Sequence, residues 1–309
     1  MPPDTPLTRR SLLVVTGKGG VGKTLVAALL GRHLASRGRR TLLLEVDPRA
    51  NLHELAGTPP SAGDLVRVSP TLFLQNLQPA FVMEQVVRDH LRVDALVRRV
   101  TKSAIYKHFI DAAPGLKEMA ILGHAWRLLH GMGPESAHGI EVVVLDAPAT
   151  GHGLALLTAP FVVAEVIDQG PFAEMAGQLA TFMGDDQQVA VVTVTLAEEM
   201  PVQEALELRD GLVERLRRPP ALLVINGLYP ELPRGRTRRG DPTTELWARR
   251  WAMNERELRR LDARWEGPRL RLPLVPVHRG PELVDALLPA FEAGLDDAGV
   301  IGADRAARS

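Results

Sequence analysis

A glycine- and lysine-rich segment near the start of the sequence has the residue types and spacing that bind phosphate groups. It reads Gly17-Lys18-Gly19-Gly20-Val21-Gly22-Lys23-Thr24. An apolar run typical of a strand precedes it, and a helix-compatible run follows it. In that setting the glycines let backbone N–H groups turn toward phosphates, and the helix N-terminus adds a positive dipole. We predict a P-loop in which Lys23 contacts the β- and γ-phosphates of a nucleotide and Thr24 contacts Mg²⁺.

Two acidic residues at the ends of predicted strands fit the same chemistry. Asp47 follows the apolar run 41–46, and Asp146 ends the run 142–146. Beside a γ-phosphate, Asp47 would orient the attacking water and Asp146 would hold Mg²⁺ through water. For Asp47 the alternative is an ordinary turn with Pro48. We assign the metal site to Thr24, Asp47 and Asp146.

The elements that must position these residues alternate along the chain. Strands are predicted at 12–16, 41–46, 142–146, 189–196, 221–226 and 270–275, and most are apolar throughout, as in parallel strands buried on both faces. We predict a single α/β domain over residues 1–309 with a doubly wound, mostly parallel sheet of the P-loop NTPase type. Ligands of such sheets bind at the carboxyl ends of the strands.

Two stretches depart from this alternation. Residues 79–132 have a helical pattern and predict an inserted helical subdomain, with one helix at 116–129. A second helical stretch is predicted at about 241–265. The region 231–265 carries ten arginines against six acids, which we interpret as a solvated helix face rather than a nucleic-acid patch. Residues 1–10 and 296–309 are expected to be flexible ends.

Composition excludes several function classes. The 309 residues have a formal net charge of zero, so no global field attracts nucleic acid or anionic lipid. The sequence has no cysteine, which excludes disulfides and thiolate metal sites. Its longest uncharged apolar stretch, 153–164, is too short to span a bilayer, and the first ten residues lack the apolar core of a signal peptide. We expect a cytoplasmic protein with no nucleic-acid partner and no intrinsic membrane segment.

Further motifs give the chain a family resemblance. A lysine directly after the first P-loop glycine, here Lys18, is typical of the deviant subclass that includes ParA, MinD, the nitrogenase iron protein and ArsA. The order of P-loop, then Asp-Pro with Asn51 following, then Asp146 with Thr-Gly-His at 150–152, resembles the ArsA family. That family contains the arsenite-pump ATPase and the ATPase that targets tail-anchored membrane proteins. The resemblance extends from about Ser11 to about Leu288.

The resemblance implies an ATPase that uses ATP and Mg²⁺ as a dimer, with Asp47, Lys18 and Lys23 as catalytic residues. Lys18 would cross to the partner's nucleotide and offset charge in the transition state. The second switch would comprise Asp146, Thr150, Gly151 and His152. The implied nucleotide-binding residues are Gly17, Lys18, Gly19, Gly20, Val21, Gly22, Lys23, Thr24, Leu25, Asn51, Glu204, Asn226, Pro273, Val275 and Val277. For Glu204 and Asn226, an exposed helix carboxylate and a strand-end cap remain the alternatives.

The chain departs from the family pattern at three points. Leu25 replaces a second threonine after the P-loop lysine, Ala50 stands where a histidine is common, and the family's cysteines are absent. A soft metalloid needs soft ligands, so arsenite transport is disfavoured. We expect a nucleotide-switched homodimer, or a heterodimer with a related chain, that does conformational work on a protein client or membrane partner. The alternatives are an anion-pump motor subunit and a positioning ATPase like ParA or MinD.

One apolar set in the predicted helical region leaves two interpretations open. It could line a groove for a client, since methionine suits adaptable binding, or it could be ordinary packing between the helices and the sheet. Its members are Met119, Leu122, Trp126, Met132, Phe172, Met175, Phe182 and Met183.

Overall fold

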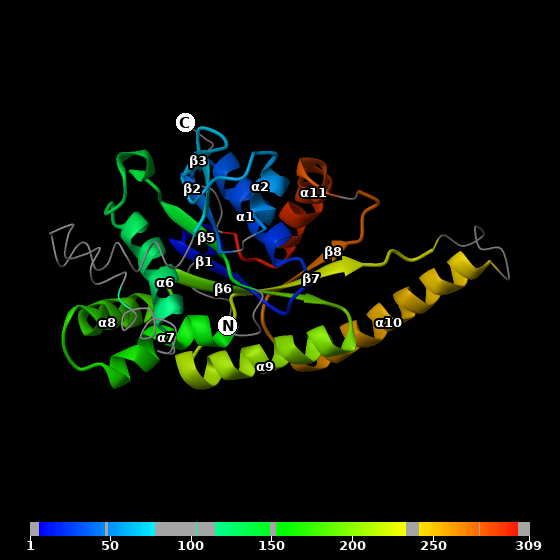
Figure 1. The fold of residues 1–309 in the computed structure, drawn as a ribbon. Helices are drawn as coiled ribbons and strands as arrows, with labels where there is room; N and C mark the ends of the chain where they lie inside the picture. The colour runs from blue at the N-terminus through cyan, green and yellow to red at the C-terminus, as the bar shows by residue number, and fades with distance from the viewer. Residues whose placement is uncertain are drawn as a thin grey trace, which may run out of the picture.

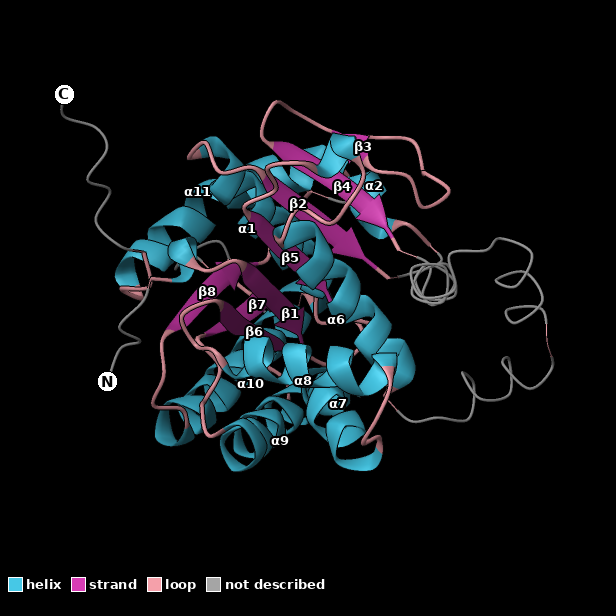
Figure 2. Ribbon diagram, turned by 90° about the vertical axis from the view of Figure 1, so that its left-hand side faces the viewer, coloured by secondary structure: helices cyan, strands magenta, loops and turns pink. Residues whose placement is uncertain are grey.

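The fold is given by a computed structural model, which describes residues 6–46, 49–77, 103, 115–148, 153–232, 241–277 and 279–301. These residues form an eight-stranded sheet in the order β3-β4-β2-β5-β1-β6-β7-β8 (Figures 1 and 2). Neighbouring strands are parallel except for the antiparallel pair β3–β4. With helices on both faces, this is the predicted doubly wound α/β fold.

The strands agree closely with the apolar runs of the sequence. The bounds are β1 (Leu12–Thr16), β2 (Thr41–Glu45), β3 (Val66–Arg67), β4 (Leu72–Asn76), β5 (Val142–Asp146), β6 (Val189–Leu196), β7 (Leu222–Leu228) and β8 (Arg269–Pro273). Strands β1, β5 and β6 have the predicted bounds, and β2, β7 and β8 differ by one or two residues at their ends. The sequence analysis missed β3 and β4. β3 is a two-residue strand, and β4 ends in polar residues that weaken its apolar signal.

The helices divide between the two faces of the sheet. One face carries α1 (Lys23–Ser36), α2 (Asn51–Ala56) and α11 (Pro281–Asp297), and the other carries α6 (Leu116–Leu129), α7 (Gly153–Val166), α8 (Pro171–Gly184), α9 (Glu199–Leu216) and α10 (Pro242–Arg264) (Figure 1). Helix α10 lies within the stretch at about 241–265 for which the sequence predicts a helix. Short 3₁₀ turns lie at Leu7–Arg9 and Glu135–Ala137.

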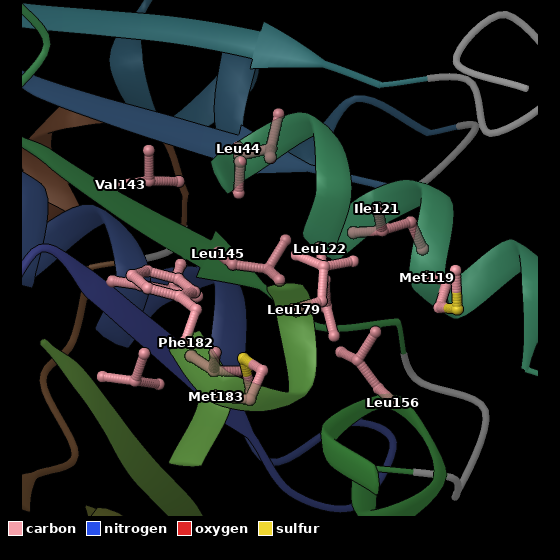
Figure 3. Packing of buried hydrophobic residues seen from close by; sticks show 14 of the residues in the cluster. Leu44, Met119, Ile121, Leu122, Val143, Leu145, Leu156, Leu179, Phe182 and Met183 are labelled. Atoms are coloured by element: carbon pink, nitrogen blue, oxygen red, sulfur yellow. The ribbon is translucent and has the colours of Figure 1, made fainter. Parts of the chain in front are cut away.

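The apolar set that was considered as a client groove lies largely in the core. Met119, Leu122 and Met183 are fully buried and Phe182 is 5% exposed, and they pack with strand residues such as Leu145 (Figure 3). Of the rest, Trp126, Phe172 and Met175 pack partly buried against this cluster, while Met132 is exposed. Ordinary packing is therefore the correct interpretation for the buried members of this set.

The predicted insertion at 79–132 is only partly described. Its helix at 116–129 matches α6, while residues 78–102 and 104–114 lie outside the described residues. Of the predicted flexible ends, the structure describes residues 6–10 and 296–301. The backbone N–H of Leu7 donates to the carbonyl oxygen of Val300 at 2.8 Å, and both side chains are buried. Within the described ranges, every helix is too short or too polar to cross a bilayer.

Candidate nucleotide-binding site

The predicted chemistry gathers at one edge of the sheet, where the parallel strands have their carboxyl ends. Strand register places Val15 beside Asp146, Glu45 beside Asp146, and Leu196 beside Asn226. After β1 the chain continues to β2 on one side, whereas after β6 it continues to β7 on the other. The loop after β1 therefore lies at a topological switch point, where ligands of open α/β sheets bind.

The loop after β1 has the backbone conformation of a phosphate-binding loop. Gly17, Gly20 and Gly22 have φ values of 149°, 82° and 91°, which favour glycine. A Cβ at Gly17 would lie 2.2 Å from the carbonyl oxygen of Val194, and a Cβ at Gly22 would lie 2.2 Å from Nδ2 of Asn226. The loop then enters α1 at Lys23, where the first N–H groups of the helix lack intrahelical partners and can bind an anion.

Four predicted side chains contact the loop or each other. Nζ of Lys23, which is 6% exposed, donates to the carbonyl oxygen of Lys18 at 3.0 Å. Nδ2 of Asn226 donates to the carbonyl oxygen of Val21 at 2.9 Å, so its amide braces the P-loop. Nζ of Lys18 lies 2.7 Å from Oε1 of Glu204, and both side chains are about one-third exposed, at 35% and 36%. The ion pair joins two residues that the sequence analysis assigned to the site.

The residues assigned to Mg²⁺ supply hard oxygen ligands. Thr24 lies in the first turn of α1, and Asp146 is the last residue of β5 and 5% exposed. Among the described residues, no group of three or more histidine, cysteine or acidic side chains could hold a metal by itself. Mg²⁺ commonly takes one or two protein ligands and completes its shell with substrate phosphates and water, so this donor set fits it. Asp47, the third assigned ligand, lies outside the described residues.

Glu45 has a role that was not predicted from the sequence. Its side chain is fully buried at the end of β2, and both carboxylate oxygens accept from the N–H of Leu52, at 3.1 and 3.2 Å. The carboxylate therefore anchors the start of α2, the helix that follows Asp47. Ala50, just before α2, adopts a left-handed conformation with φ 51°, which costs a non-glycine residue roughly 1–2 kcal/mol. An acidic residue at the end of an apolar strand was the available signal.

His53 has a structural role in the same region. It is fully buried, and its ring nitrogens lie 3.0 Å from Oγ1 of Thr58 and 3.2 Å from Oγ of Ser61. Burial lowers the pKa of His53 from its ordinary value. The histidine therefore holds the turn after α2 and does not replace the histidine that is common at position 50.

The other predicted residues have different outcomes. Thr150, Gly151 and His152 lie outside the described residues. A Cβ added at Gly153, the first residue of α7, would lie 2.1 Å from Oγ1 of Thr16. The start of α7 therefore lies against the base of the P-loop. The remaining assigned positions keep their place at this edge: Leu25 in α1, Asn51 at the start of α2, Pro273 at the end of β8, and Val275 and Val277 in the segment that follows.

Comparisons with known proteins match this chain to one family and to several curated relatives. A family model described as anion-transporting ATPase, ArsA_ATPase, matches residues 10–182. ATPase BagA of Mycobacterium tuberculosis is 26% identical over 226 residues, covering 71% of this chain and 65% of that protein. The arsenical pump-driving ATPase of Escherichia coli is 27% identical over 231 residues, covering 73% of this chain and 36% of that protein. ATPase GET3C of Arabidopsis thaliana is 28% identical over 169 residues, covering 50% and 42%. The chain thus spans less than two thirds of the length of these relatives.

Proposed function

Because this chain belongs to the ArsA family of anion-transporting ATPases, we propose that it binds and hydrolyses ATP with Mg²⁺ at the P-loop edge of its sheet. The observation that carries the proposal is the P-loop itself, with left-handed glycines at 20 and 22, and Lys23 at the start of α1. A Cβ atom at Gly17 or Gly22 would clash with a neighbouring atom, so both positions require glycine. The loop can therefore close its backbone N–H groups around phosphate oxygens.

Each residue of the site has a proposed task. Lys23 and the first N–H groups of α1 contact the β- and γ-phosphates. Thr24 and Asp146 hold Mg²⁺, which when bound offsets the negative charge of the phosphates. Asp47 orients and deprotonates the attacking water, a role supported by the strand register that brings the end of β2 beside the end of β5. Asn226 supports the loop from β7 and offers its amide to the base.

We further propose that two chains sandwich the nucleotides and that Lys18 acts on the nucleotide of the partner. Lys18 follows the first P-loop glycine and its side chain is about one-third exposed, so it can leave its own chain's loop. A cation brought to a transferring phosphoryl group stabilises charge in the transition state, as an arginine finger does. The dimer would close in ATP and open after hydrolysis.

Mixing two inactive variants tests this arrangement. Lys18→Ala lacks the cation, and Asp47→Asn lacks the water-activating carboxylate, so each homodimer should hydrolyse ATP poorly. A mixed dimer has one site with both groups intact if Lys18 acts across the interface. An equimolar mixture should then regain about a quarter of wild-type activity, because half of the dimers are mixed and each has one complete site. A mixture as inactive as its components would refute action in trans.

The output we propose is conformational work on a protein client or membrane partner. The names of the relatives include both a pump-driving ATPase and a GET3-type ATPase. The lack of cysteine disfavours arsenite as the effector, because arsenite binds through soft thiolates. We therefore expect arsenite to leave the ATPase rate unchanged. Asp47→Asn held in ATP should retain a stoichiometric partner that is released in ADP, and a partner bound equally in both nucleotides would contradict nucleotide-switched work.

A further inference from the structure

A cavity of about 720 Å³ lies at the edge of the sheet opposite the P-loop. Its walls come from the segments that precede β1, β6, β7 and β8 and from the C-terminal turns of α9 and α10, two helices that lie side by side on one face (Figure 1). Pockets for small molecules have volumes of about 300–1,000 Å³. The cavity therefore has the size of a ligand site and shares no residue with the proposed nucleotide site.

Two arginines, one buried and one half-buried, form part of the wall. Arg10 is 4% exposed and donates to the carbonyl oxygen of Val189 at 3.1 Å. Arg218 donates to the same oxygen at 3.1 Å and to the carbonyl oxygen of Met183 at 2.5 Å. Desolvation lowers the pKa of both guanidinium groups, and for Arg218 the charge of Arg10 lowers it further. Two neighbouring cations in a partly desolvated wall favour an added negative charge.

The cavity wall also contains donors that the protein leaves unused. Nε of Arg218 and Nε1 of Trp265 are buried and have no hydrogen-bond partner among the described residues. The Trp265 side chain is 3% exposed, and its N–H faces Gly267, where a Cβ would lie 3.1 Å away. Leaving a buried donor unpaired costs about 1–3 kcal/mol. Both groups are donors with almost no accessible surface, so a ligand that supplies acceptor oxygens would satisfy them once wall side chains shift to admit it.

Charge and shape restrict the ligand further. The lining contains four arginines and four acidic residues, so it is formally neutral and unsuited to a polyanion such as a nucleotide. Asp186 raises the pKa of both Arg10 and Arg218 and already offsets part of their charge. Proline, valine and the Trp265 ring supply apolar wall. We propose that this cavity binds a small organic molecule with one carboxylate, which accepts from Arg218 and Trp265, and an apolar body.

Benzoate is a suitable probe, with benzamide as its neutral analogue and inorganic phosphate as an anion without an apolar body. The chain has four tryptophans, so 5-fluorotryptophan labelling gives four ¹⁹F resonances that Trp→Phe variants can assign. Benzoate should shift the Trp265 resonance saturably, and benzamide and phosphate should shift it at least tenfold less at equal concentration. An unmoved Trp265 resonance, or equal shifts with phosphate, would overturn the proposal.

Two variants locate the binding by calorimetry. Trp265→Phe removes the N–H and keeps a ring, and it should weaken benzoate binding about fivefold, as expected for one lost hydrogen bond. Trp247→Phe is the matched control, because the indole of Trp247 donates to the carbonyl oxygen of Pro230 outside the cavity. Gly267→Ala, which crowds Nε1 of Trp265, should also weaken binding. Equal affinity in wild type, Trp265→Phe and Gly267→Ala would refute the site. The measurement requires no ATP, so its failure is separate from failure of the proposed ATPase function.

Discussion

One buried hydrogen bond predicts a pH dependence of stability. Nε2 of His124 in α6 lies 2.8 Å from Oε1 of Gln75 in β4, and Nε2 of Gln75 donates to the carbonyl oxygen of Gly63 at 2.9 Å. His124 must therefore be the donor in its neutral form. Burial, with a smaller effect from the charge of Arg127, lowers its pKa to about 4. The bond joins the strand before the predicted insertion to a helix within it.

The direction and size of this pH dependence of stability follow from proton linkage. An unfolded histidine has a pKa of about 6.5, so between pH 6.5 and 4 the unfolded state binds more protons than the folded state. The stabilisation from neutral His124 is complete above pH 6.5 and is lost as the pH falls toward 4. From the two pKa values, unfolding should become easier by about 2 kcal/mol between pH 7 and pH 5 through this residue alone.

Urea unfolding at several pH values measures this effect. His124→Gln keeps a side-chain N–H donor but does not titrate, so the wild-type loss of stability should exceed that of the variant by about 2 kcal/mol at pH 5. His130 follows the last residue of the same helix and is exposed, which makes His130→Gln the control. If wild type and His124→Gln lose stability in parallel between pH 7 and 5, the reasoning about a neutral buried donor is wrong.

Three further predictions concern the proposed nucleotide site. Gly22→Ala places a methyl group 2.2 Å from Nδ2 of Asn226, at a residue whose φ is 91°. A left-handed backbone conformation alone costs alanine about 1–2 kcal/mol, so the variant should bind a fluorescent ATP analogue at least tenfold more weakly. Gly153→Ala should lower the midpoint of thermal unfolding, because its Cβ would lie 2.1 Å from Oγ1 of Thr16, and an unchanged midpoint would contradict the close contact. Glu45→Ala should destabilise the chain by about 1–3 kcal/mol in urea unfolding, since the N–H that opens α2 loses its buried acceptor, whereas Glu45→Gln should retain part of that stability.

The sequence predicted those parts of the fold that local patterns determine. Strands β1 and β5 are continuous apolar runs that end in polar residues, so both their bounds and their place beside the P-loop could be read. β4 was missed because only its first three residues, Leu72–Leu74, are apolar, which leaves too short a run to identify as a strand. The anchoring of α2 by Glu45 could not be read either, because it depends on how the chain turns back after the strand end.

The Lys18–Glu204 ion pair illustrates what only the fold supplies. The resemblance assigned both residues to the nucleotide but gave no contact within one chain, whereas the two charged groups lie 2.7 Å apart. Both side chains are about one-third exposed, and ion pairs of that kind contribute about 0.2–1 kcal/mol. A cation acting on a transferring phosphoryl group contributes a rate factor of about 10³–10⁵, which is several kcal/mol. The pair is therefore too weak to keep Lys18 from a partner's nucleotide, as the proposed action in trans requires.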